Sequence, residues 1–166
     1  MKIMQTVRIP TGYLTVECKE NEGHPVLRIG YEKDLDPQPQ NHPVAEVSHR
    51  EGEELLVSFY KEGEDAPIFT KSVTVAHENV NRRPAPSGLW ISTPIGRLLS
   101  ETKGTEDAYP GVYVSLCVEE MNVDQSELVL TVEYETERQE IWTILYQKGK
   151  DEPVHIMRYA DGKDLA

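Results

Sequence analysis

Two short acidic runs are the best candidates for a functional site in this chain, because their carboxylates could bind basic groups. Each half of the chain contains one run: Glu62, Glu64 and Asp65 in the first half, and Glu133, Glu135 and Glu137 in the second. Carboxylates grouped in this way can meet the lysine and arginine side chains with which other proteins hold phosphate groups. The sequence therefore predicts a partner-binding site at these six residues.

Paired carboxylates can also serve acid–base catalysis, and further adjacent pairs occur at 53–54, 119–120 and 151–152. A glycosidase needs two carboxyl groups that face each other across a cleft at about 5 to 9.5 Å, and adjacency in sequence does not establish that geometry. The chain contains no Gly-x-Ser-x-Gly nucleophile motif and no glycine-rich phosphate-binding loop. We therefore expect no catalytic residue, no cofactor and no enzymatic activity.

The histidines do not have the spacing of a metal site. They stand at positions 24, 42, 49, 77 and 155, so no two lie four residues apart, and no Cys-x-x-Cys accompanies them. Asp34, Asp36 and His42 share one loop and could in principle hold a divalent cation. The loop lacks the glycine and the terminal glutamate of an EF-hand. We therefore expect no metal.

The segments that must position these residues repeat along the chain. Six residues recur at an offset of 84, namely Pro10, Gly12, Leu14, Glu17, Lys19 and Glu22 as Pro94, Gly96, Leu98, Glu101, Lys103 and Glu106. The pattern Tyr-x-x-Gly-x-Asp-x-Pro at Tyr60 returns 86 residues later at Tyr146. A duplication explains this better than chance. We expect a first repeat at 1–79, a proline-containing linker at 80–88 and a second repeat at 89–166.

Apolar residues recur at every second position, which is the spacing of β-strands. Leu14, Val16 and Cys18 alternate with polar neighbours in the first copy, as do Val112 and Val114 in the second. No window has a helical period, and eleven prolines interrupt the chain. We expect an all-β, antiparallel fold: two tandem six-strand repeats packed as a pseudo-symmetric pair of small barrels or half-sandwiches.

The fifth strand of each copy, at 55–60 and 141–146, is apolar at both odd and even positions. This pattern is typical of a strand in the middle of a sheet that is covered on both faces. We therefore expect these strands at sheet centres, with Trp142 in the core.

Charge is the main compositional signal. The chain has 17 basic and 29 acidic residues, giving −12, and residues 1–80 (8 against 14) and 81–166 (9 against 15) each carry −6. Direct binding to DNA or RNA is disfavoured, because phosphate contacts require clustered lysine and arginine. A dispersed negative charge fits either a well-solvated surface or a surface that meets a basic partner.

The sequence also bears on the cellular compartment. No apolar run approaches the length of a membrane span, and residues 1–8 become polar before a signal-peptide core could form. Cys18 and Cys117 fall at unrelated positions of the repeat, so we expect two reduced thiols rather than a disulfide. The expected location is the cytoplasm.

Two segments carry a resemblance to a known group of proteins. Residues 10–17 (PTGYLTVE) and 107–116 (DAYPGVYVSL) are similar to stretches of uncharacterised small acidic β-rich proteins from phages and mobile elements of gut Firmicutes. The resemblance implies an intracellular accessory protein of a mobile element. Anti-defence inhibitors, including anti-CRISPR proteins, come from such settings.

The functional expectation combines the charge with this resemblance. It is a non-enzymatic intracellular protein-binding module, an acidic inhibitor of a nucleic-acid-binding protein that acts as a nucleic-acid mimic. The expected partner is a basic protein surface, with no direct nucleic acid and no membrane. The alternative is a β-scaffold hydrolase, or a protein that binds a small ligand or carbohydrate.

Overall fold

Twelve β-strands make up the regular structure in the computed structural model, which describes residues 4–21, 24–34, 41–49, 54–61, 64, 66–74, 89–93, 96–104, 110–117, 127–146, 153 and 155–159. The first sheet contains β1 (Met4–Ile9), β2 (Gly12–Asn21), β3 (His24–Lys33), β4 (His42–His49), β5 (Glu54–Tyr60) and β6 (Pro67–Thr74). The second contains β7 (Leu89–Thr93), β8 (Gly96–Lys103), β9 (Gly111–Cys117), β10 (Glu127–Glu135), β11 (Glu140–Leu145) and β12 (His155–Tyr159).

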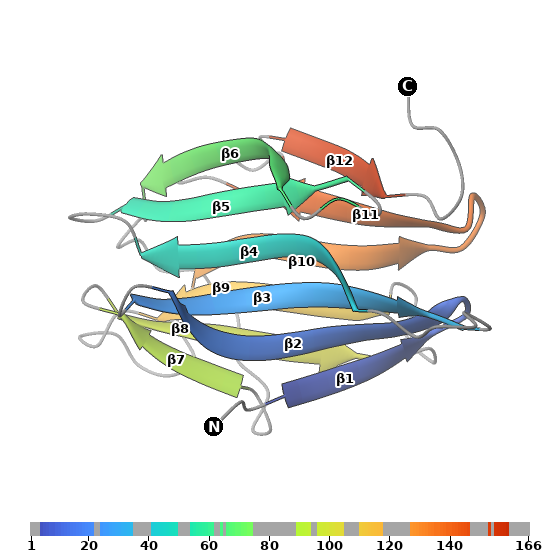
Figure 1. Ribbon diagram of the computed structural model, residues 1–166, viewed down its shortest axis with the longest axis horizontal. Coiled ribbons are helices and arrows are strands. Elements are labelled where there is room, and N and C mark those ends of the chain that lie inside the picture. Colours follow the sequence, from blue (N-terminus) through green and yellow to red (C-terminus); the bar gives the residue numbers. More distant parts are fainter. Residues whose placement is uncertain are drawn as a thin grey trace.

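Each sheet is an antiparallel meander in which strands adjacent in sequence are adjacent in space. The strand orders are β1-β2-β3-β4-β5-β6 and β12-β11-β10-β9-β8-β7. Figure 1 shows the two sheets as stacked layers whose strands run in similar directions, with β1 and β7 at one side and β6 and β12 at the other. This is the aligned packing of a β-sandwich.

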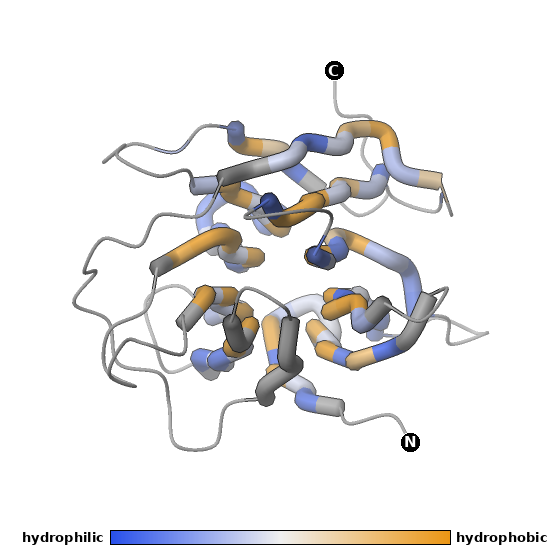
Figure 2. Tube along the Cα trace, turned by 90° about the vertical axis from the view of Figure 1, so that its left-hand side faces the viewer, coloured by the Kyte–Doolittle hydropathy of each residue, from blue (hydrophilic) through white to orange (hydrophobic). Residues whose placement is uncertain are grey.

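Alternation along the strands forms the core between the layers. In the first sheet, Val16 on β2, Ile29 on β3 and Ala45 on β4 are register partners with no exposed surface. One hydrophobic cluster includes these residues together with Val114 and Leu130 of the second sheet. Figure 2 shows apolar residues along the strands of both layers. Burying each large aliphatic side chain in this way contributes about 1.5–3 kcal/mol.

The expected all-β, antiparallel fold is confirmed, but its barrel form is wrong. Among the described residues, no pairing joins β1 to β6 or β7 to β12, so both sheets are open. A meander closes into a barrel only if its first and last strands pair, and here each sheet instead covers its apolar face with the other sheet. The two halves therefore share one core. The linker predicted at 80–88 lies outside the described residues.

The two strands with apolar residues at both odd and even positions, β5 and β11, do not lie at sheet centres. Both β5 and β11 stand next to an edge strand, β6 and β12 respectively. Trp142 on β11 is half-buried and faces away from the core, because its neighbours Ile141 and Thr143 point inward. The apolar residues on the outer side of these strands therefore cover the outside of the sandwich.

Among the described residues, no helix meets the length and hydropathy that crossing a membrane requires.

Close backbone approach requires glycine at Gly111, at the start of β9. A Cβ atom there would lie 2.1 Å from the carbonyl oxygen of Val132 and 2.9 Å from the Cα of Glu133. Both contacts are with backbone of the adjacent strand β10, which cannot move without disturbing the pairing of the two strands.

We expect Gly111→Ala to lower the free energy of unfolding by about 1–3 kcal/mol, the usual cost of overpacking. Gly104→Ala is the matched control, because a Cβ at Gly104 meets no atom within 4 Å. Urea unfolding at neutral pH measures both variants. Equal midpoints for the two variants would contradict the described approach of β9 to β10.

Candidate functional site

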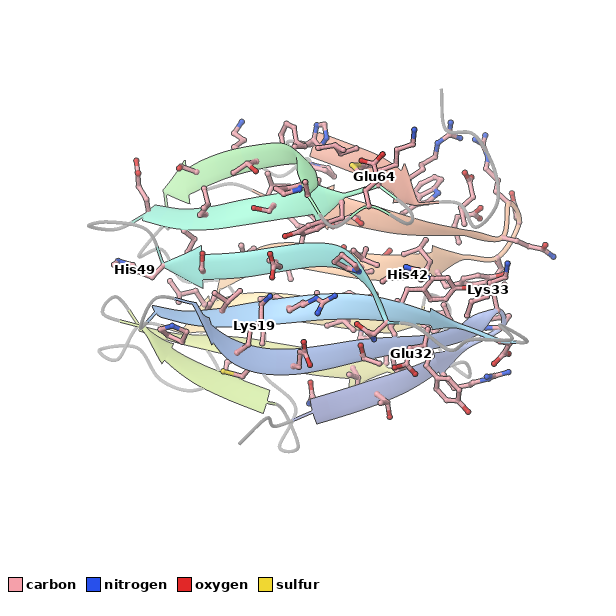
Figure 3. All side chains as sticks on the ribbon, in the orientation of Figure 1. Lys19, Glu32, Lys33, His42, His49 and Glu64 are labelled. Atoms are coloured by element: carbon pink, nitrogen blue, oxygen red, sulfur yellow. The ribbon has the colours of Figure 1, made fainter. Side chains whose placement is uncertain are left out.

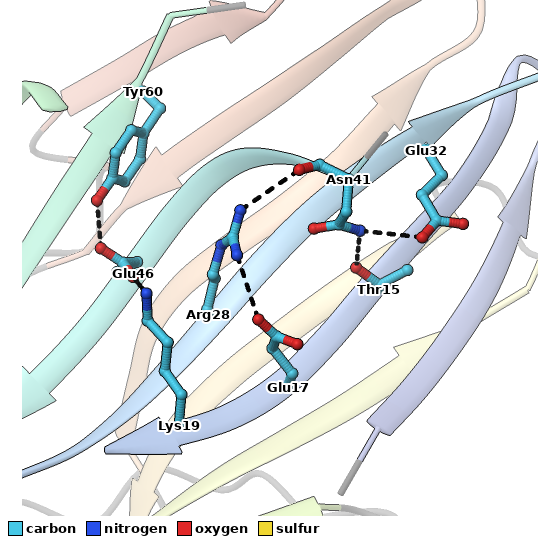
Figure 4. Close-up of polar contacts among 8 residues, drawn as sticks. All are labelled: Thr15, Glu17, Lys19, Arg28, Glu32, Asn41, Glu46 and Tyr60. Atoms are coloured by element: carbon cyan, nitrogen blue, oxygen red, sulfur yellow. Dashed lines mark hydrogen bonds and ion pairs between the residues drawn. The ribbon is translucent and has the colours of Figure 1, made fainter. Parts of the chain in front are cut away.

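A network of polar side chains crosses the outer face of the first sheet, and we call it the polar ladder. Its members come from β2, β3 and β5, together with the start and the middle of the β4 segment: Thr15, Glu17, Lys19, Arg28, Glu32, Asn41, Glu46 and Tyr60. The inward positions of these strands belong to the core, so the alternating positions face outward. Figure 3 shows these side chains in the context of the sheet, and Figure 4 shows their contacts.

One end of the polar ladder centres on the carboxylate of Glu46. The hydroxyl of Tyr60 donates a hydrogen bond to Glu46 Oε1, and Lys19 Nζ lies 3.1 Å from Glu46 Oε2. Burial raises the pKa of Tyr60 above its ordinary value, and the adjacent Glu46 carboxylate raises it further. The phenol therefore stays protonated and acts as a hydrogen-bond donor. A catalytic tyrosine nucleophile would need the opposite shift.

The other end centres on Asn41. Its side-chain Nδ2 donates to Thr15 Oγ1 at 2.7 Å and to Glu32 Oε1 at 3.4 Å, while its backbone carbonyl oxygen accepts from Arg28 Nη2 at 3.5 Å. Arg28 Nη1 also lies 3.2 Å from Glu17 Oε1, which ties β2 to β3.

Gly30 makes room for this arrangement. A Cβ atom at Gly30 would lie 2.0 Å from Asn41 Oδ1, so the amide of Asn41 occupies the space that any other residue's side chain would fill. The position of Asn41 thus depends on a glycine one strand away.

The chemistry available to the polar ladder is recognition and structural support. Arg28 faces Glu17 of the neighbouring strand β2, and Lys19 on β2 reaches across β3 to Glu46 on β4, so both positive charges are compensated within the network. Part-exposed ion pairs of this kind contribute about 0–1 kcal/mol each. Their main effect is to fix the register of four strands while keeping the outer face polar.

The six predicted partner-binding residues are placed differently from one another. Glu62 and Asp65 lie outside the described residues, and Glu64 is exposed in the β5–β6 connection, where its backbone N–H donates to the Lys61 carbonyl. Glu133 is half-buried on the outer face of β10, opposite Trp142.

The hairpin between β10 and β11 holds the last two. The Glu135 carboxylate accepts hydrogen bonds from the backbone N–H groups of Glu137 and Arg138, at 3.1 and 2.8 Å. Gln139 completes the turn with a φ of 57°. Glu135 is therefore engaged in shaping the turn, whereas Glu137 is exposed at its tip.

The strands that lead into the two acidic connections run in the same direction. In Figure 1, β5 and β10 both run toward the right, although β5 ends nearer the middle of its sheet than β10 does. Glu64 and Glu137, about 70 residues apart in the chain, are both exposed.

Asp34, the first of the three residues that could in principle hold a cation, forms an ion pair with Arg8. Arg8 donates two hydrogen bonds to the Asp34 carboxylate, at 2.8 and 2.5 Å. These bonds lower the pKa of the Asp34 carboxyl. The guanidinium carbon of Arg8 also lies 4.8 Å from the ring centroid of Tyr13. Asp36 lies outside the described residues. Within the described part of the chain, no three His, Cys, Asp or Glu side chains are grouped to hold a metal.

Sequence reasoning missed the polar ladder. The outward positions of β2 and β3 alternate with core residues, which is visible in the sequence, but their partners Asn41 and Glu46 follow a long loop. Only the register of β3 against β4, which contains an irregularity between Ile29 and Gly30, brings them together.

Comparison with known proteins gives no match: no family model, no curated protein and no solved structure is similar to this chain.

Removing the hydroxyl of Tyr60 tests the Glu46 end of the polar ladder. We expect Tyr60→Phe to cost about 1–2 kcal/mol at neutral pH, because Glu46 loses a charge-assisted hydrogen bond. The raised pKa means that the folded state favours the protonated phenol. Its contribution is therefore complete below the ordinary value of 10.0 and is lost as the pH rises above it.

Urea unfolding across the alkaline range measures this effect. The wild type should lose stability above pH 10.0 more steeply than Tyr60→Phe. Tyr13→Phe is the control, because the Tyr13 side chain is exposed. An unchanged stability and an unchanged alkaline slope in Tyr60→Phe would show that the Tyr60–Glu46 bond does not form.

Proposed function

We propose that this chain is a non-enzymatic protein-binding module that docks a basic partner surface against one end of the sandwich. The observation that supports the proposal is that β5 and β10, which belong to different sheets and lead into the two acidic connections, run in the same direction (Figure 1). Glu64 and Glu137 supply the exposed carboxylates.

The described residues carry only a small part of the net negative charge of the chain. The described residues include 13 acidic and 10 basic residues, whereas the whole chain has 29 and 17. The remaining 16 acidic and 7 basic residues, which account for −9 of the net charge of −12, lie outside the described residues. On the outer face of the first sheet, Lys19 and Arg28 offset two of the three glutamates of the polar ladder.

The partner class follows from this charge and from the resemblance to phage and mobile-element proteins. A nucleic-acid-handling protein, such as a CRISPR effector, exposes lysine and arginine that normally hold phosphate groups. Carboxylates at the end of the sandwich would occupy that surface as a mimic of nucleic acid. The proposal places this encounter in the cytoplasm.

We also propose that the two sheets arose by duplication and are related by pseudo-symmetry. Glu17 and Glu101, which correspond in the sequence repeat, are buried to a similar degree at 9% and 8% exposure, and both sheets are six-strand meanders. In a crystal structure, residues 5–76 should superpose on 90–160 strand by strand. A different strand order in the two halves would contradict the duplication.

A pull-down from the lysate of the encoding cell, followed by mass spectrometry, tests the binding proposal. We expect capture of a basic nucleic-acid-handling protein at low salt and its loss at high salt, because exposed charges are screened beyond about 8 Å at physiological ionic strength. Added nucleic acid should compete with the captured protein.

Charge-reversal variants locate the contact. The double variant Glu64→Lys with Glu137→Lys should abolish capture. Glu54→Lys is the matched control, because Glu54 is equally exposed but begins β5 at the opposite end of the sandwich. Capture that is indifferent to salt, recovery of a polysaccharide or membrane receptor, or equal loss in the control would refute the proposal.

A further inference from the structure

Three aromatic rings join the two sheets at the side where β6 and β12 lie. The rings of Phe69 on β6 and His155 on β12 are stacked, with centroids 3.9 Å apart and an interplanar angle of 5°. Phe59 on β5 lies 5.5 Å from Phe69 and 5.6 Å from His155. We call these three residues the aromatic clasp. No strand pairing links β6 to β12 among the described residues, so the aromatic clasp connects two open sheet edges.

Strand β12 has few other attachments. It pairs with β11 over five residues, and among the described residues no strand pairs with its other side. Met157 packs against the core, whereas Ile156 is 49% exposed. Arg158 Nη1 lies 3.7 Å from Glu140 Oε1 on the outer side. A short edge strand with little buried surface has low local stability, so the aromatic clasp contributes a large share of what holds it.

The charged groups around His155 oppose its protonation. Lys71 of β6 adds positive charge near the imidazole, and the elements packed on its other sides contribute the uncharged Phe59 of β5 and Leu145 of β11. An imidazolium can bind the face of an aromatic ring. Burial is the larger effect here, and together with Lys71 it lowers the pKa of His155 below its ordinary value of 6.5.

We propose that the aromatic clasp is an acid-sensitive switch: protonation of His155 loosens β12 from β6 and frees the last strand of the second sheet. The sign follows from linkage. The folded state favours neutral imidazole. The stability that the aromatic clasp gives to the β6–β12 contact is therefore fully present above pH 6.5 and falls as the pH drops below that value. We expect the opening to be local, because no histidine is fully buried between the other strands in the described part of the chain. The inference is independent of the proposed binding function.

Hydrogen–deuterium exchange with site resolution tests the proposal, once rates are corrected for the intrinsic effect of pH. Between about pH 7 and about pH 5, where histidine titrates, amides of β12 should lose about threefold to tenfold in protection while those of β2 and β3 hold theirs. His155→Phe keeps a stacked ring that cannot be protonated, so its β12 should show no such loss.

Lys71→Met provides a second variant that leaves the aromatic clasp intact. Removing the neighbouring positive charge should shift the opening, and the imidazole titration followed by NMR, to higher pH. The proposal is wrong if β12 protection does not respond to pH, if His155→Phe responds like the wild type, if all strands open together, or if Lys71→Met leaves the midpoint in place.

Discussion

The shared core between two open sheets is the constraint on which the rest of this structure depends. Neither meander closes on itself, so each exposes an apolar face that only the other sheet covers. Inward positions such as Val16, Ile29 and Val114 therefore make the contact between the layers, and the charged side chains of the polar ladder lie on the outer face. The polar ladder, the acidic connections and the aromatic clasp are three consequences of that division.

These three features use the available surfaces in different ways. The polar ladder pairs both of its positive charges with glutamates on the outer face of β2 to β5, which leaves that face polar. Among the described residues, Glu64 and Glu137 are exposed acids in the β5–β6 connection and the β10–β11 hairpin. The aromatic clasp lies at an edge, where each sheet lacks a further strand and the two sheets meet through side chains.

Much of the fold could be predicted from local sequence, because alternation reports directly which residues share a face. The strands around Leu14, Ile29 and Val114 follow this rule, and their inward positions are buried as expected. Barrel closure could not be predicted, since it depends on pairing between the first and last strands of a sheet. The apolar outer positions of β11, including Trp142, gave a false indication of a central strand. Apolar residues at both odd and even positions occur when both faces of a strand are buried, but also when apolar residues simply cover the outside of the sheet.

The candidate site was only partly accessible to sequence reasoning. Glu64 and Glu137 could be identified as exposed acids because they stand in turns. The engagement of Glu135 with the backbone of its own hairpin required the turn geometry around Gln139. Asn41 entered the polar ladder through a register irregularity opposite Gly30, and such irregularities leave no signal in a single sequence.

Calorimetric unfolding of the intact chain tests the shared core most directly. If the two sheets cover each other, neither can unfold while the other remains folded. The account therefore predicts one transition, with a ratio of calorimetric to van't Hoff enthalpy of about one. Two separate transitions, or a calorimetric enthalpy about twice the van't Hoff value, would show that each half has its own core and would contradict the account.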